Sequence, residues 1–114
     1  MAKAAIPDPL KRRHLIEQEL SEAQCLAIVD AYAAEGRAVE SVQFLAKAGA
    51  EERLLELAEE AIRGGDTFLL KHVCEALGRE FSAERWGELA THAEASGRIR
   101  YAETARRQAL VGES

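Results

Sequence analysis

A helical hairpin that recurs along the chain limits most strongly what this sequence can fold into. Three glycines, Gly36, Gly65 and Gly97, each end one helical pattern and precede another, and they lie 29 and 32 residues apart. Before each glycine, apolar side chains recur at i, i+3, i+4 and i+7, the spacing of an amphipathic α-helix. Because three such units follow one another in register, we expect an internal repeat of helical hairpins.

The other local signals are also helical. Asp8 and Pro9 are typical of a helix start, because aspartate caps the first turn and proline fits the first helical position. This helix is expected to run to about Leu20. Ser21 and Gln24 have the spacing of a capping box, and Asp66 and Ser82 are expected to cap later helices.

Strands are not expected, because Val, Ile and Thr are scarce and no alternating pattern is present. The sequence therefore predicts an all-α fold of seven helices in a single domain, residues 1–114. Its parts are a capping helix at 8–20 and hairpin repeats at 21–49, 50–81 and 82–111.

The expected core consists of the apolar stripe of each repeat helix. Its members, in chain order, are Cys25, Ile28, Val29, Tyr32, Val39, Val42, Leu45, Ala46, Leu54, Leu57, Ala58, Ala61, Leu69, Leu70, Val73, Cys74, Leu77, Trp86, Leu89, Ala90, Ala93, Ile99, Ala102, Ala105 and Ala109.

Composition excludes several classes of function. With 47% hydrophobic and 31% charged residues, the chain has the balance of a folded domain. Its net charge of −5 argues against nucleic-acid binding, which needs a basic surface. The N-terminus lacks the apolar segment of a signal peptide, and no apolar run is long enough to span a membrane. We therefore expect a cytoplasmic protein.

No catalytic or metal-binding pattern emerges. The histidines, His14, His72 and His92, fall in different predicted helices. Cys25 and Cys74 lie far apart on apolar stripes, so buried, unreactive thiols are expected rather than a metal framework or a redox pair. We expect no enzyme activity, no metal and no cofactor.

The hairpin units resemble degenerate tetratricopeptide repeats. The third unit reads Trp86-x-x-Leu89-Ala90-x-x-Ala93 before its turn glycine, and the first and second units have other apolar residues at the same spacing, Cys25-x-x-Ile28-Val29-x-x-Tyr32 and Leu54-x-x-Leu57-Ala58-x-x-Ala61. The resemblance covers residues 22–110 and implies a right-handed α-α superhelix. A looser α-solenoid, such as a HEAT-like stack, and a non-repeating bundle of seven helices remain alternatives.

The resemblance also implies a binding surface. In tetratricopeptide arrays, the first helix of each hairpin lines a concave groove. The residues expected in that groove are Leu26, Asp30, Glu52, Leu55, Glu56, Glu59, Glu84 and Glu88. An acidic groove attracts cationic partners, so we expect a protein or peptide partner that is basic or amphipathic. The alternative is that these glutamates only solvate helix surfaces.

A second function class comes from the C-terminal end of the array. Ile99, Tyr101, Leu110 and Val111 could leave apolar surface on the last helix, since a stack of repeats needs a cap at each end. This pattern predicts a self-associating structural protein, a homodimer paired through that helix, as the alternative to a peptide-binding module.

Overall fold

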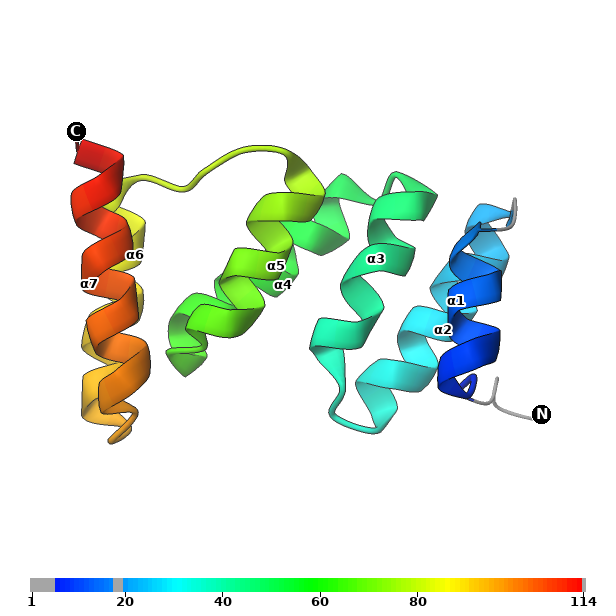
Figure 1. The fold of residues 1–114 in the computed structure, drawn as a ribbon, viewed down its shortest axis with the longest axis horizontal. Helices are drawn as coiled ribbons and strands as arrows, with labels where there is room; N and C mark the ends of the chain where they lie inside the picture. Colours follow the sequence, from blue (N-terminus) through cyan, green and yellow to red (C-terminus); the bar gives the residue numbers. More distant parts are fainter. Residues whose placement is uncertain (1–5, 18–19, 114) are drawn as a thin grey trace. The chain divides into compact units, whose positions relative to one another are not determined.

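The computed structural model describes residues 6–17 and 20–113, and it shows only α-helices in this part of the chain (Figure 1). The seven helices are α1 (Pro9–Glu17), α2 (Glu22–Ala34), α3 (Ala38–Ala48), α4 (Glu51–Gly64), α5 (Thr67–Leu77), α6 (Ala83–Ala95) and α7 (Ile99–Glu113). The prediction of an all-α fold with seven helices is confirmed for the described residues.

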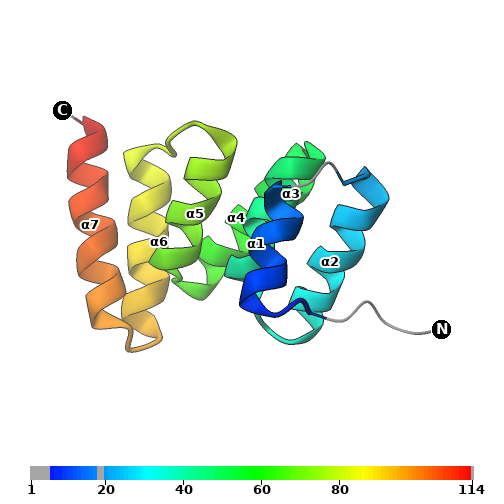
Figure 2. The same cartoon turned by 45° about the vertical axis from the view of Figure 1, so that its right-hand side comes forward.

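The chain divides into two compact units, Met1–Leu54 and Leu55–Ser114. The first unit contains α1, α2, α3 and the first turn of α4. The second unit contains the rest of α4 together with α5, α6 and α7. Adjacent helices pack together within each unit, as the pairs α2–α3 and α6–α7 show (Figure 2).

Helix starts follow the local signals in the sequence. The Asp8 carboxylate accepts a hydrogen bond from the Lys11 amide at 2.9 Å. Ser21 and Gln24 form both hydrogen bonds of a capping box. The side chains of Asp66 and Ser82 accept from the amides three residues later, at 3.0 and 3.3 Å. Each of these bonds satisfies a first-turn amide that has no partner within its helix.

The three repeat turns have the same geometry. Gly36, Gly65 and Gly97 have positive φ angles of 69°, 66° and 77°. After each glycine, the next amide donates to the carbonyl five residues earlier. The three bonds are Arg37 to Tyr32 at 2.9 Å, Asp66 to Ala61 at 2.8 Å and Arg98 to Ala93 at 2.7 Å. This is the closing bond of a Schellman motif, which ends a helix where glycine adopts the left-handed conformation. The turns are therefore equivalent in structure as well as in sequence.

In the first unit, α2 and α3 bury their apolar stripes against each other. Cys25, Val29 and Tyr32 are buried on α2, and Val42, Phe44 and Leu45 are buried on α3. The rings of Tyr32 and Phe44 stack with centroids 6.0 Å apart and planes 28° apart. Burial of these large side chains is the main stabilising contribution in this unit.

In the second unit, α6 packs against α7, and many of the buried residues on these two helices are small. Trp86, Leu89, Ala90 and Ala93 are buried on α6, and Ala102 and Ala105 are buried on α7. Helix α5 also contacts α7. The buried hydroxyl of Thr67 donates to the Tyr101 carbonyl at 2.8 Å and so joins α5 to α7.

Two predicted core positions were wrong. Ala46 is exposed, whereas Phe44 and Ser41 of the same helix are buried, so the packed stripe of α3 is rotated from the predicted one. The buried Ser41 hydroxyl donates to the Ala38 carbonyl at 2.6 Å and therefore carries no unmet hydrogen bond. Ile99, expected in the core, is 53% exposed in the first turn of α7.

Helix α1 is described over Pro9–Glu17, and Leu20 is not helical. The predicted extension to Leu20 also covers residues 18 and 19, which lie outside the described residues.

Candidate peptide-binding surface

The residues predicted to line a groove lie on α2, α4 and α6, the first helices of the three hairpins. Five acidic side chains are exposed: Asp30, Glu52, Glu56, Glu59 and Glu84. Leu26, Leu55 and Glu88 are half-buried. All the predicted acidic residues are therefore open to solvent at least in part, and the two leucines are partly covered.

In the second unit, Arg85 brings α4 and α6 together at this surface. Its guanidinium donates to a Glu88 oxygen at 2.8 Å and also pairs with Glu59 of α4. The hydrogen bond to Glu59 raises the pKa of Arg85 above its ordinary value. Glu56 precedes Glu59 by three residues and Glu84 precedes Glu88 by four, so each lies beside its neighbour on the same helix face.

The first unit contains an equivalent ion pair. Arg53, in the first turn of α4, donates to Asp30 of α2 at 3.2 Å. Asp30 and Glu59 each precede a turn glycine, Gly36 or Gly65, by six residues. Their partners Arg53 and Arg85 each precede the following turn glycine by twelve residues. The two units therefore contain the same acid–arginine pair at the same repeat positions.

The positions equivalent to this pair at the ends of the series carry no charge. Gln24 occupies the arginine position of the first hairpin, and its side chain is used in the capping box. Thr91 occupies the acid position of the third hairpin, where its hydroxyl donates to the Gly87 carbonyl at 3.1 Å. The acid–arginine pair thus occurs wherever the first helix of one hairpin contacts the first helix of the next. Neutral residues occupy the positions of the first and last hairpins that have no such neighbour.

The sequence analysis did not predict that Arg53 and Arg85 form ion pairs with acidic residues of the preceding first helix. The signal that could have found them is their constant distance from the turn glycines. Within each unit, the arginine charge makes the exposed face of the first helices less acidic than the carboxylates alone suggest. In the second unit, we use the name α4–α6 surface for the charged residues around this ion pair. They are Glu56, Glu59, Arg63, Glu84, Arg85 and Glu88. This set carries four negative and two positive charges and remains acidic.

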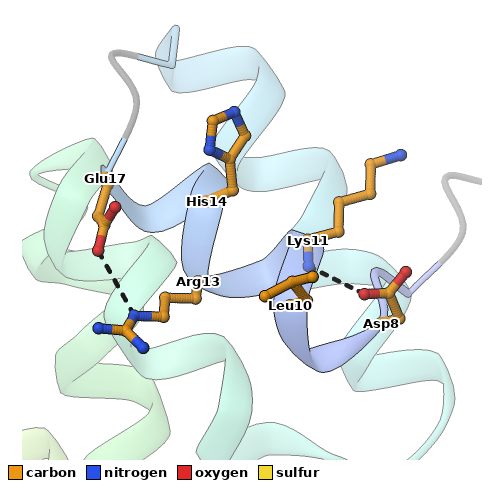
Figure 3. Close-up of a pocket in the computed structure, with 6 residues that line it drawn as sticks. All are labelled: Asp8, Leu10, Lys11, Arg13, His14 and Glu17. Atoms are coloured by element: carbon orange, nitrogen blue, oxygen red, sulfur yellow. Dashed lines mark hydrogen bonds and ion pairs between the residues drawn. The ribbon is translucent and has the colours of Figure 1, made fainter.

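Two hollows, one in each unit, are lined by residues other than the predicted groove residues. One, with a volume of about 570 Å³, follows α1 and is lined by Asp8, Leu10, Lys11, Arg13, His14 and Glu17 (Figure 3). Figure 3 shows Arg13 directed to Glu17, with its Nε 3.6 Å from the carboxylate. Another, of about 530 Å³, lies beside the third repeat turn and is lined by Asp66, Gly97, Arg98, Ile99, Arg100 and Tyr101. Both mix charges of the two signs.

The nucleophilic and metal-binding side chains are dispersed. Cys25 and Cys74 are buried free thiols, as predicted, and burial raises the pKa of Cys74 to about 11. His72 lies against Phe68, with its Nδ1 2.9 Å from the Phe68 carbonyl oxygen. Among the described residues, no three His, Cys, Asp or Glu side chains converge as metal ligands would. No helix in residues 6–17 and 20–113 is long and apolar enough to cross a membrane.

Comparisons with known proteins found no matching family model, no matching curated protein and no matching solved structure. The geometry of the two units is therefore what supports a functional proposal.

Proposed function

We propose that this chain is a non-catalytic protein-interaction module that binds a basic or amphipathic peptide on its first helices. In this proposal, the hairpins stack as a right-handed, tetratricopeptide-like superhelix, so that α2, α4 and α6 share one concave face. The observation that carries the proposal is the acid–arginine pair that recurs at equivalent positions in both units.

The repeated pair supports stacking of the hairpins because it joins consecutive first helices in each unit. Asp30 and Arg53 join α2 to α4 within the first unit, and Glu59 and Arg85 join α4 to α6 within the second. A chain that uses one geometry at each junction builds a regular array, in which every repeat contacts its neighbours in the same way.

The charge of this face indicates the kind of partner. Among the described residues, the exposed side chains of Glu52, Glu56 and Glu84 form no ion pair within their own units. They are therefore available to cations of a ligand, whereas Glu59 and Glu88 are already held by Arg85. An acidic face with unpaired carboxylates attracts a basic segment and accelerates its association. The half-buried Leu26 and Leu55 provide contacts for apolar residues of an amphipathic ligand.

Titration with peptides tests this function. A lysine–leucine amphipathic peptide and its glutamate–leucine counterpart would be titrated against the full chain. Salt would be set to about 0.01 M and about 0.15 M, which changes the Debye length from about 30 Å to about 8 Å. We expect the basic peptide to bind, with an affinity that falls as salt rises, and the acidic peptide not to bind.

A matched pair of variants tests where that peptide binds. The double variant Glu56→Gln, Glu84→Gln should weaken binding of the basic peptide. The control, Glu75→Gln with Glu103→Gln, removes the same charge from exposed positions on α5 and α7. If both double variants weaken binding equally, net charge explains the affinity and the proposed face is not the site.

A second candidate function is self-association through α7. Three apolar residues are exposed on this helix, with Ile99 at 53% and Leu110 and Val111 at 66% each. Exposed apolar surface of this kind favours pairing with another copy. Light scattering over a range of concentrations would show a dimer that Leu110→Ser and Val111→Ser abolish. A monomer at every concentration would rule this function out.

A further inference from the structure

Arg12 of α1 occupies a site built by α2 and α3. Its guanidinium carbon lies 5.9 Å from the Tyr32 ring centroid and 5.6 Å from the Phe44 ring centroid. Its Nη2 donates to the Glu40 carbonyl at 2.9 Å. An arginine held by two aromatic rings and a backbone acceptor is recognised by cation–π attraction together with a directed hydrogen bond.

The same site contains polar groups without partners. Among the described residues, the Arg12 Nε and the Tyr32 hydroxyl are buried and make no hydrogen bond. Tyr32 and Phe44 are both 0% exposed with α1 in place. Arg37 also lies over the Tyr32 ring, at 5.3 Å, and is neutralised by its ion pair with Glu40. The site is therefore shaped for a guanidinium, although its hydrogen-bonding capacity is not fully used by Arg12.

The helix that supplies Arg12 is weakly attached. Helix α1 has nine residues, none of them buried, and Leu10 is 80% exposed. Helices this short are not stable alone in water, so α1 depends on its contacts with the rest of the unit. Besides Arg12, only Leu15 and Ile16 of the helix are partly covered, three and four residues further along the same face. Segments with so few buried contacts open at a low free-energy cost.

We propose that the site under α1 is an interaction surface for a partner protein, and that α1 is its resident competitor. The partner segment is a helix that carries one arginine followed, three and four positions later, by aliphatic residues, the arrangement of Arg12, Leu15 and Ile16. It displaces α1 and places its own guanidinium between Tyr32, Phe44 and the Glu40 carbonyl. This site is separate from the acidic face of the first helices and does not depend on it.

The chemistry of the site selects arginine over lysine. A planar guanidinium can lie against an aromatic ring while its NH groups, which point outward in the guanidinium plane, donate to a carbonyl beside the ring. An ammonium is more strongly hydrated and has no planar face, so it fits the same site less well. A partner in which lysine replaces the arginine should therefore bind more weakly, although the charge is the same.

Competition in the full-length chain tests the proposal. The probe is a synthetic, acetylated peptide with the sequence of residues 8–17, DPLKRRHLIE. We expect the Arg12→Ala chain, whose resident side chain is removed, to bind the probe roughly tenfold more tightly than the wild-type chain. The matched control chain is Arg13→Ala, because Arg13 is exposed on the outer side of α1 and should bind the probe as wild type does.

Substitutions at Arg12 and Arg13 of the probe peptide test whether the site is specific for arginine. Replacing the probe's Arg12 by Lys or Gln should weaken its binding, whereas replacing its Arg13 by Gln should not. Indifference of binding to Arg12 of the probe would overturn the proposal, as would failure of the folded Arg12→Ala chain to bind. Arg12→Ala should raise the affinity for the probe by the same factor in the Glu56→Gln, Glu84→Gln chain as in the wild-type chain, which separates this site from the acidic face.

Two further measurements test the release of α1 without a peptide. Amide hydrogen exchange of the wild-type chain should show residues 12–17 exchanging much faster than the amides of α2 and α3, and equal protection would refute a releasable α1. Light scattering should show that Arg12 has no effect on oligomeric state. A wild-type dimer that is lost in Arg12→Ala would instead assign the site to α1 of a second copy and overturn the partner proposal.

Discussion

Gly65 lies directly against the backbone of Ala93. A Cβ atom placed on Gly65 would come within 2.5 Å of both the Cα and the amide nitrogen of Ala93. The turn between α4 and α5 therefore packs onto α6 at a distance that only glycine permits. Gly65 also has a positive φ of 66°, so two independent constraints meet at one residue.

This relationship predicts a large difference between two similar substitutions. Gly36→Ala should cost about 1–2 kcal/mol, from the left-handed backbone alone, because nothing lies within 4 Å of its Cβ position. Gly65→Ala should cost about 1–3 kcal/mol more, because the backbone of Ala93 must move. Urea unfolding of both variants measures the difference. Equal losses of stability would show that the turn can shift away from α6 without strain.

The repeated ion pair should show measurable but small coupling. Double-mutant cycles on Glu59 with Arg85, and on Asp30 with Arg53, should each give a coupling of about 0.2–1 kcal/mol, because these side chains are partly exposed. Both couplings should decrease as salt screens the charges. A control cycle on Glu59 with Arg107, which form no ion pair in the described structure, should give no coupling. If one pair couples and the other does not, the two ion pairs are not equivalent features of the repeat.

The ion pair of Arg37 and Glu40 should make stability depend on pH. Arg37 Nε donates to Glu40 at 2.6 Å, and this hydrogen bond lowers the pKa of Glu40 in the folded chain. Because the pKa is lower in the folded state, the stabilisation is present above the unfolded value of about 4.3 and is lost as pH falls below it.

Comparison with a single variant isolates this contribution. The free energy of unfolding of wild type and Glu40→Gln should differ at pH 7, and the two values should converge as the pH falls through the lowered pKa of Glu40 in the folded chain. Glu103→Gln, at an exposed position on α7, provides the matched control. A difference that persists unchanged to acid pH would mean that Glu40 acts through packing rather than through its charge.

The cysteines should be unreactive in the folded chain. Cys25 is fully buried, and burial raises the pKa of Cys74 to about 11. At pH 8 a thiol with this pKa is only about one part in a thousand thiolate, the form that reacts. Labelling by a thiol reagent should therefore be slow in native buffer and rapid for both residues in denaturant. Rapid native labelling of either cysteine would show that its helix opens readily.

Local signals in the sequence predict most of the helix boundaries. Ser21 with Gln24, Asp66 and Ser82 start helices because a side chain and an amide three residues away can satisfy each other without the rest of the fold. The turn glycines end helices for an equally local reason. Most of the core stripe also follows from periodicity, as the burial of Trp86, Leu89, Ala90 and Ala93 on α6 confirms.

The stripe of α3 shows where periodicity fails. Val42 and Leu45 are compatible with two neighbouring faces, one that includes Ala46 and one that includes Phe44. The stacking of Phe44 on Tyr32 selects the second face, and this contact joins residues on different helices. A pattern within one helix contains no information about the ring it will meet.

What the sequence by itself determined is the all-α class, the seven helices and the equivalent turns, because each depends on residues within about five positions of one another. The tertiary structure decided which charges meet. Arg53 reaches Asp30, Arg85 reaches Glu59 and Arg12 reaches the Tyr32 and Phe44 rings only after the helices have packed. Electrostatic and cation–π contacts depend on distances of a few ångströms across separate helices, and packing of the apolar faces sets those distances.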